Sequence, residues 1–143
     1  MTLAGEATAS ADVLVGDAFG ARAVPWHLST VEFAREIRRV LRPRGVYALN
    51  VIDQGPLRLA RAEAATLREV FGDVALVARS GAGGRPRGGN LVLLASETAL
   101  PSGARTTARG ARTYDDRATA HFAAGADPLR DLDAPADQLL SRR

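Results

Sequence analysis

The chain has 143 residues, of which 46% are hydrophobic and 24% charged, a balance typical of one globular domain. It contains no cysteine, which excludes disulfide frameworks, thiolate metal sites and cysteine nucleophiles and favours a cytoplasmic protein. The net charge of +3 comes from basic residues that are all arginine and are interleaved with acids, and aromatic residues make up only 5%. This pattern argues against a nucleic-acid partner, and the lack of any run of about 18 apolar residues argues against a membrane span.

The first half of the chain predicts a strand, a helix and a second strand. An apolar run ending in an acid, residues 12–19, is typical of a strand buried on both faces of a parallel sheet. Ser29 or Thr30 is expected to cap the helix that follows. The apolar face of this helix comprises Phe33, Ile37, Val40 and Leu41. The proline and glycine of LRPRG (41–45) end the helix and lead into a second buried strand at 46–51.

A second helix and a hairpin are expected next. Proline suits the first turn of a helix, so Gly55-Pro56 is expected to start it and Gly72 to end it. Its apolar stripe comprises Ala60, Ala64, Leu67 and Phe71. Strands are predicted at 74–79 and 91–95, and the glycine-rich loop between them leaves no room for a helix. These two strands therefore form an antiparallel hairpin.

From Glu97 onward the composition turns to Ala, Gly, Arg, Asp and Pro, which predicts an irregular tail lying over the body of the domain. The order strand, helix, strand, helix, strand, antiparallel strand is that of the second half of a doubly wound sheet. We therefore expect an α/β fold. Residues 1–97 form a Rossmann-like half-sheet that ends in an antiparallel hairpin, and residues 98–143 form the tail.

Polar side chains are expected at the carboxyl ends of the first two strands, where open α/β sheets bind ligands. Asp17 ends the first strand and is either a ligand-binding group or a cap for the following turn. Asn50, near the end of the second strand, either binds a ligand through its amide or satisfies backbone groups of the next turn, and the second role is favoured for Asp53. His27 is either an alternative base near neutral pH or a packed loop residue.

The remaining polar clusters are expected to be structural. His121 has no neighbour at metal-ligand spacing. Asp115-Asp116 and the aspartates of 131–137 do not match an EF-hand loop, so they are interpreted as turn residues that balance the arginines, and no metal site is predicted. The segment RPRGG (85–89) is expected to be a solvated hairpin tip, because a phosphate cradle needs its amides at the start of a helix.

In their order and spacing, several segments together resemble the spermidine synthase-like branch of the class I S-adenosylmethionine-dependent transferase fold. They are ADVLVGDAF (11–19), VPWHLSTVEF (24–33), LRPRGVYALN (41–50), TLREVF (66–71), FAAGADPL (122–129) and APADQLL (134–140). Members of this fold bind the nucleotide with a glycine-rich turn and an acid that both precede the matched region, and this sequence contains neither. The resemblance therefore implies the C-terminal half of such a domain.

The resemblance implies transfer of a propylamine group to a polyamine from decarboxylated S-adenosylmethionine, a co-substrate rather than a tightly bound cofactor. Asp17 matches the first acid of the family's Asp-x-x-Asp pair, which holds the polyamine and takes its proton, whereas Gly20 replaces the second acid. Such a base is needed because an amine with a pKa of about 10 is protonated in water. We assign substrate binding to Asn50 and His27, and donor binding to Ala18 and Phe19.

Two alternatives stay open beside aminopropyl transfer. One is methyl transfer from S-adenosylmethionine, and the other is a non-catalytic interaction module or truncated remnant. Without the first half of the fold, residues 12–15 form a hydrophobic sheet edge with unpaired amides and carbonyls. Besides a small-molecule amine substrate, we therefore expect self-association or a partner chain at this edge.

Overall fold

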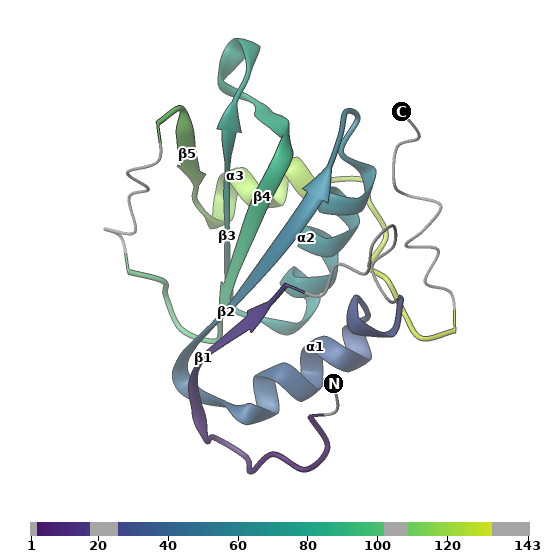
Figure 1. The fold of residues 1–143 in the computed structure, drawn as a ribbon, viewed down its shortest axis with the longest axis vertical. Coiled ribbons are helices and arrows are strands. Elements are labelled where there is room, and N and C mark those ends of the chain that lie inside the picture. Colours follow the sequence, from purple (N-terminus) through teal and green to yellow (C-terminus); the bar gives the residue numbers. More distant parts are fainter. Residues whose placement is uncertain (1–2, 18–25, 102–108, 133–143) are drawn as a thin grey trace.

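The computed structural model describes residues 3–17, 26–101 and 109–132. In these residues a five-stranded sheet is combined with three α-helices (Figure 1). The strands are β1 (Ala11–Gly16), β2 (Leu41–Asp53), β3 (Asp73–Ser80), β4 (Pro86–Ser96) and β5 (Ala111–Tyr114). The helices are α1 (Val31–Val40), α2 (Arg58–Val70) and α3 (Asp116–Ala123), with short 3-10 turns η1 (Trp26–Leu28) and η2 (Ala82–Gly84). None of these helices is long and apolar enough to cross a membrane.

The sheet has the order β1-β2-β4-β3-β5. β1 and β2 are parallel, β4 lies between β2 and β3 and is antiparallel to both, and β5 is antiparallel to β3. The strands β1, β2 and β3 therefore run in one direction. This topology confirms the expected Rossmann-like half-sheet and its antiparallel hairpin.

The helices form one layer against the sheet, in which α2 contacts both α1 and α3. Thr30 caps α1 as expected, because its hydroxyl accepts a hydrogen bond of 3.3 Å from the backbone amide of Phe33. On β2, Tyr47, Leu49 and Val51 point into the core between the layers, in the alternation that a strand imposes.

The second helix begins later than the sequence predicts. The Gly55–Pro56 peptide bond is cis, Leu57 is in the left-handed region at φ 61°, and α2 begins at Arg58. Leu57 gives no side-chain cap. Asp53 provides the missing cap, because its Oδ2 atom accepts a 3.0 Å hydrogen bond from the Ala60 amide in the first turn of α2.

The expectation of an irregular tail after Glu97 is wrong for part of that segment. β5 extends the sheet along β3, and Asp115 caps α3 by accepting a 2.8 Å hydrogen bond from the Ala118 amide. Further on, the chain crosses α1 and α2, where Val31 donates to the Leu129 carbonyl at 2.8 Å. The division of the chain into a domain of residues 1–97 and a tail of residues 98–143 stays a prediction.

The face of the sheet opposite the helices carries exposed apolar side chains at the β1 end. Val13 and Val15 are 61% and 65% exposed and Ile52 is 43% exposed. The expectation that the first strand is buried on both faces is therefore wrong for this chain. Among the residues that the structure describes, β1 is an edge strand that pairs with β2 alone, and the helices lie on one of its faces.

Candidate functional site

Two of the residues expected to bind substrate meet at one edge of the sheet. Asp17 directly follows β1, and Asn50 lies near the end of the parallel strand β2. The Nδ2 atom of Asn50 donates a 3.0 Å hydrogen bond to Oδ1 of Asp17, and Asp17 is exposed. The structure thus brings a solvent-facing carboxylate and an amide together at the carboxyl ends of parallel strands, where open α/β sheets bind ligands.

The chemistry of this pair follows from its hydrogen bond. An ionised carboxylate only accepts hydrogen bonds and has room for about four of them, so one bond from Asn50 leaves acceptor positions open to solvent. The amide also fixes the direction of the carboxylate. Such a group can hold an ammonium group and take one of its protons.

Asn50 belongs to the face of the sheet that the helices leave uncovered. It alternates with the buried Leu49 and Val51, and Val15 pairs with Ala48 on the neighbouring strand. The Asp17–Asn50 pair therefore adjoins the surface formed by Val13, Val15 and Ile52, which we call the open face.

Asp53 has the structural role that its place in the sequence predicts. It is only 2% exposed, and its two oxygens accept hydrogen bonds from the amides of Gln54 at 2.8 Å and Ala60 at 3.0 Å. Burial raises the pKa of the Asp53 carboxyl, and these amide contacts oppose the rise. Asp53 therefore joins β2 to α2 and is not available to substrate.

The other candidates are placed as follows. His27 is exposed in η1, and its role stays a prediction. Ala18, Phe19 and Gly20 lie outside the described residues, so the donor assignment and the replaced acid also stay predictions. His121 is exposed on α3, and in the part of the chain that the structure describes no group of three acids or histidines is arranged to hold a metal ion.

The remaining aspartates connect parts of the fold. Asp116 pairs with Arg68 on α2, and its carboxylate also accepts a hydrogen bond from the Val74 amide. The Oδ1 atom of Asp131 accepts a 2.6 Å hydrogen bond from the Thr30 hydroxyl at the start of α1. The structural interpretation of these residues is correct where the chain is described, and residues 133–137 lie outside that part.

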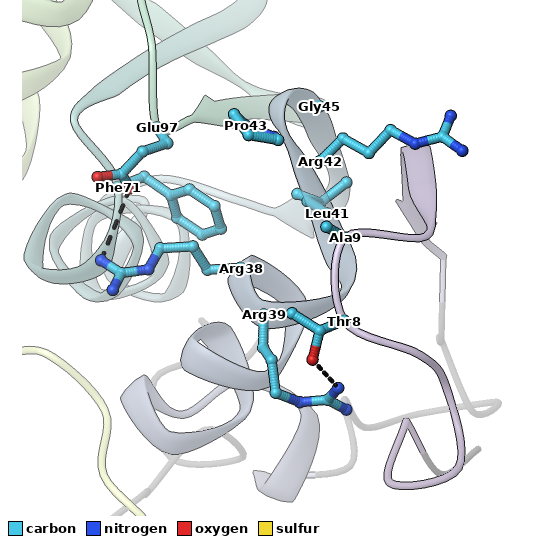
Figure 2. A pocket seen from close by; sticks show the side chains of 10 residues that line it. All are labelled: Thr8, Ala9, Arg38, Arg39, Leu41, Arg42, Pro43, Gly45, Phe71 and Glu97. Carbon is cyan, nitrogen blue, oxygen red and sulfur yellow. Dashed lines mark hydrogen bonds and ion pairs between the residues drawn. The ribbon is translucent and has the colours of Figure 1, made fainter.

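A cavity of about 350 Å³ lies at the opposite end of the sheet (Figure 2). It is lined by Thr8, Ala9, Arg38, Arg39, Leu41, Arg42, Pro43, Gly45, Phe71 and Glu97. Figure 2 shows Arg38 turned toward Glu97 and Arg39 toward Thr8. The Arg38–Glu97 ion pair measures 3.6 Å, and Arg42 pairs with Asp12 at 2.7 Å. The three arginines are already paired, and the cavity surrounds the start of β2, so it is separate from the Asp17–Asn50 pair.

A buried polar cluster was not foreseen from the sequence. It consists of Ser29, Tyr47 and Glu63, which are 3%, 4% and 2% exposed and line a small cavity between α1, β2 and α2. The signal was present, because Glu63 lies three residues after Ala60 and four before Leu67, on the apolar stripe of α2.

Comparison with known proteins gives one informative likeness. No protein-family model matches the chain, and no curated protein does either. A solved structure of a probable spermidine synthase from Corynebacterium glutamicum is 33% identical, with a TM-score of 0.77 over 90% of this chain and 50% of that chain. Human methyltransferase-like protein 13 in complex with SAH is 21% identical over 94% of this chain and 58% of that chain, with a TM-score of 0.48.

The chain thus spans about half the length of these proteins. The likeness to the probable spermidine synthase extends over 90% of this chain. The chain has the Rossmann-like fold of class I S-adenosylmethionine-dependent transferases, and the resemblance to their spermidine synthase-like branch is confirmed.

Proposed function

We propose that this chain is the amine-binding half of a polyamine aminopropyltransferase-like protein. The observation that carries the proposal is the Asp17–Asn50 pair: an exposed carboxylate, oriented by an amide at 3.0 Å, at the carboxyl ends of two parallel strands. The likeness to a probable spermidine synthase supports this choice of chemistry.

In the proposed reaction an amine nitrogen attacks the propyl carbon beside the sulfonium of decarboxylated S-adenosylmethionine. A carbon–nitrogen bond forms and the carbon–sulfur bond breaks, so the sulfur leaves as a neutral thioether. The amine must lose a proton to attack, and Asp17 accepts it. Asn50 holds the Asp17 carboxylate toward the amine, and His27 contributes to substrate binding.

We propose that the donor pocket is completed outside this chain. Its sequence contains no glycine-rich turn between a strand and a helix, the arrangement that holds a nucleotide in this fold. Within residues 3–17, 26–101 and 109–132, β1 has no strand on its outer side, and the apolar open face lies next to Asp17. Parallel strands are normally covered on both faces, so a second copy or a partner chain is expected to cover this one.

The test is a turnover assay of the chain alone and of the product of its gene read in frame upstream of Met1. Each is given a diamine with either decarboxylated S-adenosylmethionine or S-adenosylmethionine, and mass spectrometry identifies the product. Aminopropylated amine supports the proposal. A methylated product would assign methyl transfer instead, and no product from either form would favour the non-catalytic module.

Asp17→Asn tests the assigned base, because it keeps the shape of the side chain and removes its basicity. Loss of one positioned general base lowers the rate by about a hundred- to ten-thousandfold. Asp115→Asn is the matched control, since Asp115 is an exposed cap of α3. Equal turnover in Asp17→Asn and the wild type would reduce Asp17 to a turn cap.

A further inference from the structure

Ser29, Tyr47 and Glu63 form a cluster of polar side chains buried in this small core. The Ser29 hydroxyl has no hydrogen-bond partner among the described residues. Burial raises the pKa of Glu63 to about 8, and the nearby Ser29 hydroxyl opposes the rise. Polar groups buried without full pairing cost free energy, and an apolar side chain would avoid that cost. The cluster therefore calls for an explanation other than stability.

The cluster reaches the candidate site through the Tyr47 hydroxyl. Tyr47 lies on β2 opposite Leu14, two positions before Leu49, which is opposite Gly16. A methyl group on Gly16 would overlap the Tyr47 hydroxyl and would lie 3.0 Å from the Leu49 side chain. Gly16 thus leaves room for this hydroxyl, and the next residue along the chain is Asp17.

Glu63 lines the same small cavity as Tyr47. A charge on Glu63 raises the pKa of the Tyr47 hydroxyl, in addition to the larger effect of burial, so the two groups interact. Ser29, which precedes α1, and Thr66 of α2 line the same small cavity. Polar groups of α2 and of the segment before α1 therefore share a small cavity with Tyr47.

We infer that Tyr47 is a positioning residue, whose hydroxyl fixes Gly16 and thereby the Asp17–Asn50 pair. Tyr47 is buried on the helix side of the sheet and does not touch substrate. It acts by packing its hydroxyl against the last residue of β1. The catalytic meaning of this inference rests on the proposed function, whereas its structural content does not.

The first experiment is nuclear magnetic resonance on Tyr47→Phe, recording the backbone amides of Gly16 and Asp17 and the side-chain amide of Asn50. All three signals should shift. Tyr114→Phe is the matched control, because Tyr114 is also buried and its hydroxyl donates to the Gly84 carbonyl at the far hairpin. Unchanged signals in Tyr47→Phe, or equal shifts in Tyr114→Phe, would overturn the inference.

A second variant approaches the same contact from the other strand. Gly16→Ala pushes a methyl group against the hydroxyl and should move the Asn50 signal, and adding Tyr47→Phe should restore part of that change. If Tyr47→Phe alone does not fold, Gly16→Ala by itself decides the matter, and an unchanged Asn50 signal in it would overturn the inference. Equal shifts in the single and double variants would show that the hydroxyl is not the contact.

The kinetic readout separates positioning from a general loss of structure. In a form that turns over, Tyr47→Phe should lower kcat by about ten- to a hundredfold with an unchanged KM for the donor, and Tyr114→Phe should leave both unchanged. An unchanged kcat in Tyr47→Phe would overturn the positioning role. If no form turns over, the proposed function fails, while the resonance shifts still decide whether Tyr47 positions the pair.

Discussion

Glu63→Gln should make the protein less sensitive to alkaline pH. The Glu63 carboxyl is buried on α2, and its pKa is raised from 4.5 to about 8 by loss of solvation. A carboxyl whose pKa is higher in the folded than in the unfolded state binds more protons when folded. The contribution of the Glu63 carboxyl to the free energy of unfolding is therefore fully present below pH 4.5 and is lost as the pH rises toward 8.

The size of the effect follows from the shift in pKa. Each unit of difference between the folded and unfolded pKa corresponds to about 1.4 kcal/mol. Relative to its value below pH 4.5, the free energy of unfolding of the wild type should be lower by about 3 kcal/mol at pH 7. Above pH 8 the decrease should reach at most about 5 kcal/mol. Glutamine has nearly the same shape and does not ionise, so Glu63→Gln should not show this loss.

The assay is urea denaturation of the wild type and Glu63→Gln at intervals between pH 5 and pH 9. The two unfolding free energies should diverge by about 3 kcal/mol between pH 5 and pH 8. Glu36→Gln provides the matched control, because Glu36 is on the solvent side of α1 and pairs with Arg39. Parallel pH profiles for the wild type and Glu63→Gln would refute the claim that burial raises the pKa of Glu63.

Two further predictions concern the start of α1 and the open face. Thr30→Ala should lower the free energy of unfolding by about 1 to 2 kcal/mol, because it removes the helix cap and the hydrogen bond to Asp131. Thr30→Ser should keep both hydrogen bonds. Equal stability of the two variants in urea would contradict the role of the Thr30 hydroxyl. Val13→Thr with Val15→Thr keeps the side-chain shape but makes the open face polar, and it should weaken self-association in sedimentation. A wild type that stays monomeric at every concentration would contradict self-association.

The parts of the fold that depend on local pattern could be predicted from the sequence. The loop after β3 is too short for a connecting helix, so the sequence predicts the antiparallel hairpin of β3 and β4 that the structure contains. The cap at Thr30 follows from residue type and position. Asp17 and Asn50 could be expected at one edge, because the ends of parallel strands meet there.

The missed features depend on contacts that are distant in sequence. β5 has four residues, of which only Tyr114 is buried, so its own pattern is too short to predict a strand, and pairing with β3 decides its structure. The start of α2 depends on Asp53 reaching across to the Ala60 amide. Glu63 was overlooked because the stripe around it is apolar, and nothing local shows that Tyr47 and Ser29 lie beside it.

The central claim is that this chain supplies the amine-side carboxylate while the donor pocket is completed outside it. Calorimetric titration of the purified 143-residue chain with decarboxylated S-adenosylmethionine tests this claim most directly. The account predicts no saturable heat, because the residues that cradle a nucleotide are not encoded in this sequence. Saturable binding with a micromolar Kd by a stable monomer would contradict it.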